Sequence, residues 1–286
     1  MSYALVSDAT LDLPLDLIEQ YDIKVVPMAF TLDGEEILHY PDERNMTNEE
    51  FYQALKEGKT SSTSQINPMT YVDFMKPILE VGQDILYVCF TSGLSGTYQS
   101  ALLAKDMLLE DYPERKIEVV DSLCASAGQG YFVYLVAQKK EEGLSLEELT
   151  QWTIENRQRI AHWFTVDDLF HLQRGGRLSF AEAMLGSALK IKPIISVDEK
   201  GGLYVENKVR GNKRAVEYML SKMNDTMDET QTTVFVGHGD AAQRAEDLKE
   251  KILKNTKAEE VIITKIGPVI GSHTGPGMLA VLFLKK

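Results

Sequence analysis

The 286-residue sequence predicts an α/β fold, with a Rossmann-like N-terminal domain built on a parallel sheet, a C-terminal α+β domain, and a ligand between them. Three strand–loop–helix units in succession, whose strands are continuous apolar runs, are typical of a parallel sheet covered by helices. Hairpin signals mixed with helices in the second half indicate an α+β domain. The length suits two domains, which we expect at residues 1–160 and 161–286.

The first half opens with an apolar strand at 2–6 and a helix that Ser7 or Asp12 would cap. Asp33-Gly34 is a strong hairpin signal, and a capping box at Thr47 begins the next helix. The other expected elements of this half are a hydroxyl-rich loop at 62–68, strands at 84–90 and 116–121, and helices at 69–82, 97–111, 126–143 and 145–160.

In the second half, Gly201-Gly202 predicts another hairpin, between two strands within 192–211. The other expected elements are helices at 180–189, 212–223 and 241–255, strands at 232–240 and 260–267, a glycine-rich loop at 268–277, and a terminal strand at 278–286.

Ligands of parallel sheets gather at the loops that follow the carboxyl ends of the strands. In this sequence those loops are 7–8, 91–97 and 121–126, and we expect them to lie together at one edge of the sheet. The middle loop, TSGLSGT, places four hydroxyls and two glycines within seven residues, directly before a helix. This loop is therefore the first candidate for a functional site.

The composition argues against several classes of protein. A formal net charge of −13 argues against nucleic-acid binding, which needs a basic surface. No apolar run is long enough to cross a bilayer, and the N-terminus lacks the pattern of a secretory signal, so we expect a cytoplasmic protein without stable membrane insertion. Cys89 and Cys124 lie in or beside apolar runs and are expected to be buried free thiols.

One segment departs from this acidic average. Residues 171–214 contain nine lysines and arginines against four acidic residues, a local charge of +5 that leaves −18 for the rest of the chain. The segment is either a solvated face of the domain or a basic rim for an anionic ligand or an acidic partner.

Three kinds of catalytic or metal chemistry fit the sequence poorly. A nucleophile elbow requires G-x-S-x-G, but the window around Ser95 lacks the last glycine, and only His238 or His273 could serve as base. A phosphate loop at 267–274 has shortened glycine spacing and no lysine. A metal site would have to use residues without metal-ligand spacing, namely Asp8, Asp12, Asp121, His238 and Asp240.

Anion binding fits the TSGLSGT loop best. Ser95 and Thr97 precede a helix whose first N–H groups have no intrahelical acceptor and whose dipole favours negative charge. Either hydroxyl alone would more simply cap the helix, but capping needs no neighbouring glycine such as Gly96. Arg174 and Arg177 flank a Gly-Gly turn that either clamps an anion or is a surface turn.

Motifs along nearly the whole chain resemble the DegV family. They are, in order, SDATLD (7–12), TSQ (63–65), SGLSGTYQSA (92–101), DSLCASAGQG (121–130), DLFHLQRGGRLS (168–179), IKPI (191–194), HGD (238–240) and IGPVIGSHTGPG (266–277). LSGTYQSA, L-x-x-L-x-x-GGR and the closing glycine-rich stretch are specific in combination. The departures are small: Ile66-Asn67 stands where a proline often follows TSQ, and Thr91 where serine is common.

The resemblance implies a bacterial protein, not an enzyme itself, that holds a long-chain fatty acid in an apolar tunnel without a metal or another cofactor. It also implies that a separate ATP-binding kinase subunit receives the presented carboxyl and makes an acyl phosphate for phospholipid synthesis. The positions expected at the carboxyl are Thr63, Ser95, Gly96, Thr97, Arg174 and His273. Those expected at the kinase or its phosphates are Arg177, Lys208 and Arg210.

Two other functions stay open at this point. One is a serine-dependent acyl or ester hydrolase that uses Ser95, and the other is a lipid-responsive scaffold. The lipid-binding interpretation agrees in kind with the residues, because a buried carboxylate needs several donors, and two hydroxyls, loop N–H groups and an imidazole would provide them.

Overall fold

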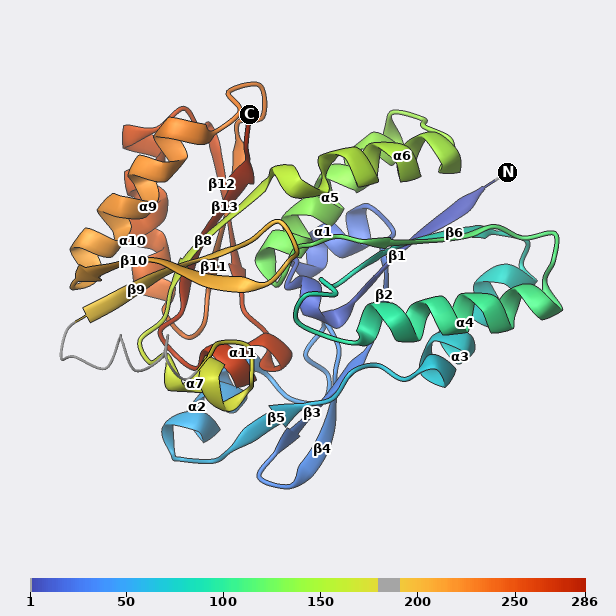
Figure 1. Cartoon of the computed structure of the whole chain (residues 1–286), viewed down its shortest axis with the longest axis horizontal. Coiled ribbons are helices and arrows are strands. Elements are labelled where there is room, and N and C mark those ends of the chain that lie inside the picture. The colour runs from blue at the N-terminus through green and yellow to red at the C-terminus, as the bar shows by residue number, and fades with distance from the viewer. Residues whose placement is uncertain (1, 180–190) are drawn as a thin grey trace.

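A computed structural model describes residues 2–179 and 191–286 (Figure 1). Within these residues the strands form sheets of four, six and three strands. The N-terminal half contains the parallel sheet and the C-terminal half a mixed sheet, so the predicted fold class is confirmed. The boundary at residue 160 stays a prediction, and the helix expected at 180–189 lies outside the described residues.

The four-stranded sheet is parallel throughout, as the continuous apolar runs predict. Helices pack against it, and its central strands are buried almost along their whole length. In spatial order the strands are β2 (Lys24–Val26), β1 (Tyr3–Asp8), β6 (Asp84–Cys89) and β7 (Ile117–Asp121). The helices that contact this sheet include α3 (Pro68–Glu80), α4 (Thr97–Asp111) and α6 (Leu146–Asn156).

The loops at the carboxyl ends of these strands meet, as predicted. The Ser7 hydroxyl donates to the Val88 carbonyl over 2.9 Å, so the ends of β1 and β6 are joined. The Ser92 N–H donates to Asp121 Oδ1 over 3.1 Å, which joins the loops after β6 and β7. The expected convergence of three loops at one sheet edge is confirmed.

A small antiparallel sheet extends from this half of the chain. Its strands are β4 (Glu35–His39), β3 (Met28–Leu32) and β5 (Ser61–Thr63). The turn at Asp33-Gly34 joins β3 to β4, and α2 (Asn48–Lys56) begins at the Thr47 capping box, both as predicted. The prediction of a loop at 62–68 is wrong for its first two residues, because Ser62 and Thr63 belong to β5 and pair with β3.

Two further local predictions are wrong. Neither Ser7 nor Asp12 caps α1 (Leu15–Gln20), which begins after Pro14. A short 3₁₀ helix, η1 (Ala9–Leu11), precedes it, and the side chain of Asp8 caps η1 by accepting from the Thr10 N–H. The loop expected at 268–277 begins with a helix, α11 (Pro268–Thr274). Gly271 and Ser272, in the interior of this helix, lower its intrinsic helix propensity. Six of its seven residues are buried, so tertiary packing stabilises the helix.

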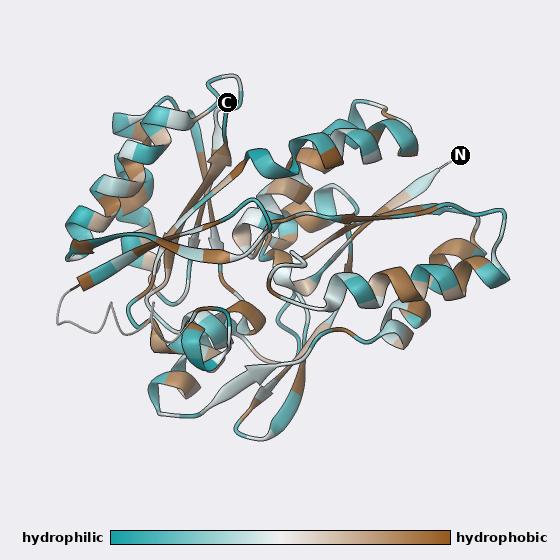
Figure 2. Ribbon diagram, viewed as in Figure 1, coloured by the Kyte–Doolittle hydropathy of each residue, from teal (hydrophilic) through white to brown (hydrophobic). Residues whose placement is uncertain are grey.

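The six-stranded sheet is mixed. Its strands in spatial order are β10 (Leu203–Arg210), β9 (Ile191–Val197), β8 (Ile160–Thr165), β13 (Leu279–Leu284), β11 (Thr233–His238) and β12 (Glu260–Lys265). The hairpin at Gly201-Gly202 joins β9 to β10 as predicted, whereas no strand was predicted for β8. Figure 2 shows hydrophobic residues along the strands and mainly hydrophilic ones on α9 (Asn212–Thr226) and α10 (Ala242–Asn255).

Helix α5 (Ala127–Glu141) lies between the two large sheets (Figure 1). It contacts β8, β11 and β13, and its first eleven residues are all buried. Tyr131 and Tyr134 place their rings 5.2 and 5.6 Å from the ring of Phe235. This helix therefore belongs by sequence to the N-terminal half while it packs against the C-terminal sheet.

The tip of the β9–β10 hairpin packs against the loop after β6. The Thr91 hydroxyl donates to the Gly201 carbonyl over 3.1 Å. Gly201 has φ +79°, and a Cβ at this position would lie 1.8 Å from Thr91 Oγ1. Glycine is required here both for the backbone conformation and for the close approach of the two segments.

Replacing Gly201 tests this close approach. We expect Gly143→Ala, at φ +94° with no atom within 4 Å, to lose about 1 kcal/mol of stability from backbone strain alone. Gly201→Ala should lose about 1–3 kcal/mol more, because its methyl group overlaps Thr91. Urea unfolding of both variants measures the difference, and equal losses would contradict the packing described here.

Candidate functional site

A largely apolar cavity lies where α5, α11 and the β9–β10 hairpin meet. It is lined mainly by apolar side chains, with a few polar groups at one end, as is common for small-molecule sites. The apolar walls come from both halves of the chain and include Phe90, Leu94, Phe164, Leu203, Met278 and Leu282. The expected ligand position between the two halves therefore coincides with a cavity of suitable chemistry.

Two segments distant in sequence meet at the polar end of this cavity. Thr63, the last residue of β5, has its Oγ1 atom 2.7 Å from Nε2 of His273 in α11. Next to this pair, the Ser61 and Ser272 hydroxyls lie 2.6 Å apart. Because Thr63 and His273 both line the cavity, the structure brings together two of the residues expected at the carboxyl.

Ser95 lines the cavity as well, at the start of α4. Its Oγ lies 2.8 Å from Thr97 Oγ1 and accepts from the Thr97 N–H over 3.3 Å. Thr97 is buried beneath it, and a Cβ on Gly96 would lie 2.0 Å from Oε1 of Gln65. Gly96 and Thr97, in contrast to Ser95, do not line the cavity. Their place is therefore behind Ser95, where Thr97 bonds to its hydroxyl.

Arg177 enters the same polar end. Its Nε donates to the Leu94 carbonyl over 3.0 Å, directly before Ser95, and its Nη1 donates to the Gly175 carbonyl. The side chain is half-buried, and burial lowers the pKa of the guanidinium. It lines the cavity, and none of the carboxylates in residues 2–179 and 191–286 forms an ion pair with it.

His273 is held neutral at this site. Burial, and to a smaller extent the charge of Arg177, lower its pKa to about 4. Its Nδ1 is buried and has no hydrogen-bond partner among the described residues. A Cβ on Gly175 would lie 2.1 Å from this nitrogen, so the Gly-Gly turn of QRGGR leaves room for the imidazole.

Arg174 does not line the cavity, in contrast to its expected place at the carboxyl. It is the last residue of α7 (Phe170–Arg174), is exposed, and has Nη2 3.0 Å from Nδ1 of His171. The chain then turns at Gly176, with φ +73°, and returns over α7 through a bond from the Arg177 N–H to the Leu172 carbonyl. Arg177 therefore takes the place that we expected for Arg174.

Lys208 and Arg210 lie away from the cavity. Both are in β10, at an edge of the six-stranded sheet, where they pair with Pro193 and Ile191. Arg210 is exposed and Lys208 is half-buried. The turn end of the same hairpin contributes Leu203 to the cavity wall, so one hairpin connects the cavity to this basic edge.

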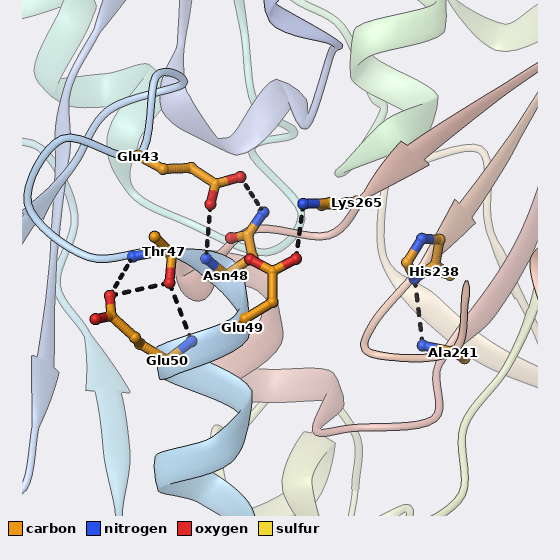
Figure 3. Close-up of polar contacts among 8 residues, drawn as sticks. All are labelled: Glu43, Thr47, Asn48, Glu49, Glu50, His238, Ala241 and Lys265. Atoms are coloured by element: carbon orange, nitrogen blue, oxygen red, sulfur yellow. Dashed lines mark hydrogen bonds and ion pairs between the residues drawn. The ribbon is translucent and has the colours of Figure 1, made fainter. Parts of the chain in front are cut away.

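The described residues do not form the hydrolytic or metal sites that were considered. Ser95 bonds to Thr97 rather than to a histidine, and His238 Nδ1 accepts from the Ala241 N–H over 3.2 Å (Figure 3). Within residues 2–179 and 191–286, no group of His, Cys, Asp and Glu side chains has the arrangement of a metal site. Cys89 and Cys124 are buried and free, as predicted.

No helix in the described part of the chain combines the length and apolar composition needed to cross a membrane.

The sequence analysis did not identify several polar residues of the cavity. Thr10, Ser64, Gln65 and His162 line it, although they come from separate parts of the chain. Thr10 carried a signal as a member of the SDATLD motif, as did Ser64 and Gln65 in TSQ, whereas His162 belongs to no motif.

Comparison with known protein families places this cavity in context. The family model described as uncharacterised protein, DegV family, matches residues 2–286. The chain belongs to the DegV family. A DegV domain-containing protein of Clostridium perfringens is 38% identical over 283 residues, which cover 99% of this chain and 97% of that protein. The DegV domain-containing protein YteA of Lactococcus lactis is 35% identical over 286 residues, 100% of this chain and 99% of YteA.

Solved structures of DegV proteins have the same fold. A DegV family protein from Thermus thermophilus, described as binding fatty acid, superposes with a TM-score of 0.88 at 30% identity and full coverage of both chains. DegV from Bacillus subtilis, described as a fatty acid binding protein, superposes with a TM-score of 0.85 at 29% identity, again over both whole chains. This DegV protein therefore shares its complete architecture with fatty-acid-binding relatives.

The lowered pKa of His273 predicts an acid-sensitive site. The unfolded imidazole, with a pKa near 6.5, takes up a proton that the folded protein excludes down to about pH 4. The free energy of unfolding should therefore fall as the pH drops from 6.5 towards 4, by about 2 kcal/mol from this residue at pH 5. Urea unfolding of the delipidated protein at pH 7 and pH 5 measures this loss.

His39 and His162 are also buried with pKa values lowered to about 4, so they add to the same trend. His273→Gln isolates one contribution, because it retains an amide that can bond to Thr63. We expect the variant to lose less stability between pH 7 and pH 5 than the unmodified protein. An unchanged loss would mean that His273 is not excluded from protonation.

Proposed function

We propose that this DegV protein binds a long-chain fatty acid in the apolar cavity and presents its carboxyl to a separate ATP-dependent kinase subunit. The carboxylate would accept hydrogen bonds from Thr63 and Ser95 and face the guanidinium of Arg177, with neutral His273 beside it. The protein itself would supply no nucleophile, metal or other cofactor. The product of the complex would be an acyl phosphate.

The observation that carries this proposal is the guanidinium of Arg177 at the end of an apolar cavity, where no carboxylate of the described residues pairs with it. Its bonds go to two carbonyls, which satisfy donors but do not neutralise the charge. Burying a cation without an anion is costly, and a ligand carboxylate would remove that cost. Hydroxyls at Thr63 and Ser95 add donors of the kind that a carboxylate accepts.

The apolar walls account for the rest of the ligand. Each buried methylene contributes about 0.8 kcal/mol, so a long acyl chain would be held mainly by burial of its tail. The polar end then fixes the direction in which the chain lies. Relatives described as binding fatty acid, at 29% and 30% identity over whole chains, support the same ligand class.

Presentation to a kinase is the finer part of the proposal. Arg174 is exposed and lies three residues before Arg177, and Lys208 and Arg210 lie on β10, whose hairpin reaches the cavity through Leu203. ATP phosphates and an acidic subunit are both drawn to such a surface. We therefore assign the partner contact to Arg174, Lys208 and Arg210.

Arg177 and Arg174 form a matched pair for testing the carboxyl site. We expect Arg177→Met to weaken binding of a long-chain fatty acid about tenfold or more, because a charge-assisted bond is lost. Arg174→Met removes the same charge three residues away and should leave binding within about twofold. Calorimetric titration of delipidated protein measures both, and equal effects of the two changes would place the carboxyl elsewhere.

Reconstitution with a DegV-dependent kinase and ATP tests presentation. The unmodified, lipid-loaded protein should support formation of acyl phosphate, detected by hydroxylamine trapping. A variant with Lys208→Ala and Arg210→Ala should retain the fatty acid but support a slower reaction, because it lacks the basic contact. Full activity of this variant would contradict the assigned surface, and absence of acyl phosphate with unmodified protein would contradict presentation.

A further inference from the structure

A second cavity lies on the other side of η1 from the apolar one. It lies between the loop after β1, the loop between β4 and α2, and the loop between β12 and α11. We call it the acidic cleft, defined by Asp12, His39, Asp42, Glu43, Asn48 and Lys265. Figure 3 shows three of its lining residues, Glu43, Asn48 and Lys265.

One buried polar atom of the acidic cleft lacks a partner among the described residues. Asn48 is 7% exposed, and its Nδ2 donates to Glu43 Oε1 over 3.0 Å, which fixes the amide and leaves Oδ1 unpartnered. His39, which is 6% exposed, lines the same cleft. Buried polar atoms are normally satisfied, so Asn48 Oδ1 indicates an occupant of the cleft.

Asp12 lies at the base of the cleft. Its Oδ1 accepts from the Gly267 N–H over 2.8 Å and its Oδ2 accepts from the Ser126 hydroxyl over 2.6 Å. A Cβ on Gly267 would lie 2.6 Å from His39 Nε2 and 3.0 Å from Asp12 Oδ1. The glycine therefore allows the carboxylate and the imidazole to approach the same point.

The free atoms of the cleft are mostly acceptors. Asn48 Oδ1, an unprotonated imidazole nitrogen of His39 and the carboxylate of Asp12 all accept hydrogen bonds. The nearby cation, Lys265, already pairs with Glu49 at 2.7 Å (Figure 3). Acidic neighbours and missing donors favour a positively charged ligand rich in N–H groups, and no metal site occurs among the described residues.

We propose that the acidic cleft binds a small organic ammonium ion, whose N–H groups are accepted by Asn48 Oδ1, His39 and the carboxylate of Asp12. This site goes beyond the fatty-acid cavity and does not depend on it. Glu43, which lines the same cleft, adds negative charge around the ligand, whereas Asp42 already pairs with Arg44 at 2.5 Å.

The pH dependence of binding distinguishes a cationic ligand from a neutral one, because only a cation favours the ionised form of Asp12. Burial, the main cause, and the charge of Asp8 raise the pKa of Asp12 to about 7. The other titratable groups around it are Tyr52 and His39, both uncharged at neutral pH, and the cleft residues Asp42, Glu43 and Lys265. An ammonium ion favours ionised Asp12, so its binding releases a proton and tightens as the pH rises through 7.

Calorimetric titration with 1,4-diaminobutane tests the proposal on the full chain. We expect binding about tenfold tighter at pH 8 than at pH 6. Asp12→Asn keeps an acceptor for the Gly267 N–H, reverses the bond to Ser126 so that the amide donates to Oγ, and removes the titration. It should therefore weaken binding about tenfold or more at pH 8 and abolish the pH dependence. Asn48→Leu should also weaken binding, whereas Glu57→Gln, an exposed position outside the cleft lining at the other end of α2, removes one charge and should change it by about twofold or less.

Several results would overturn this site. They are no diamine binding at millimolar concentration, equal binding by all variants, or tighter binding of glycerol or Mg²⁺ than of the diamine. If Asp12→Asn fails to fold, the pH dependence of the unmodified protein and the Asn48→Leu variant decide the matter. Fatty-acid retention measured on the same samples should be unchanged, which separates this outcome from the fate of the lipid-binding proposal.

Discussion

The burial of α5 between the two large sheets is the constraint on which the rest of the structure depends. A helix with eleven successive buried residues has no face for solvent and must be enclosed. Its first turn also needs glycine, because a Cβ on Gly128 would lie 2.0 Å from His162 Nε2 and one on Gly130 would lie 2.2 Å from the Leu11 carbonyl. The parallel sheet and the mixed sheet are thereby held in contact through one helix, and the apolar cavity lies beside its first turn.

Two buried charges show how structural and ligand-binding groups differ here. Asp8 is fully buried, yet its carboxylate accepts from the Tyr87 hydroxyl, the Phe90 N–H and Gln129 Nε2 at 2.8, 3.1 and 3.3 Å. That carboxylate is satisfied within the protein and holds the end of β1 against β6 and α5. Arg177, in contrast, has bonds to carbonyls but no anion among the described residues. This lack of an anion among the described residues, rather than burial as such, is the reason for proposing the ligand site at Arg177.

Local signals predicted much of the fold. Continuous apolar runs gave the parallel sheet, and turn residues located the hairpins at Asp33-Gly34 and Gly201-Gly202. The motifs likewise identified Thr63, Ser95 and His273, which line one cavity. Sequence could not separate Arg174 from Arg177, because the left-handed turn between them decides which side chain points inward. Nor could it predict β5 or α11, since both are short and depend on partners distant in the chain.

The apolar cavity and the acidic cleft share a wall, although their chemistry is opposite. Thr10 and Val269 face the cavity, while their neighbours Ala9, Leu11 and Gly267 face the cleft. The bond from Gly267 N–H to Asp12 ties the two segments of this wall together. A ligand in one site can affect the other only by moving these segments, and such an effect would be reciprocal. Arg177 and Asn48 lie outside the wall, on separate sites, so a change at either residue reports on one ligand alone.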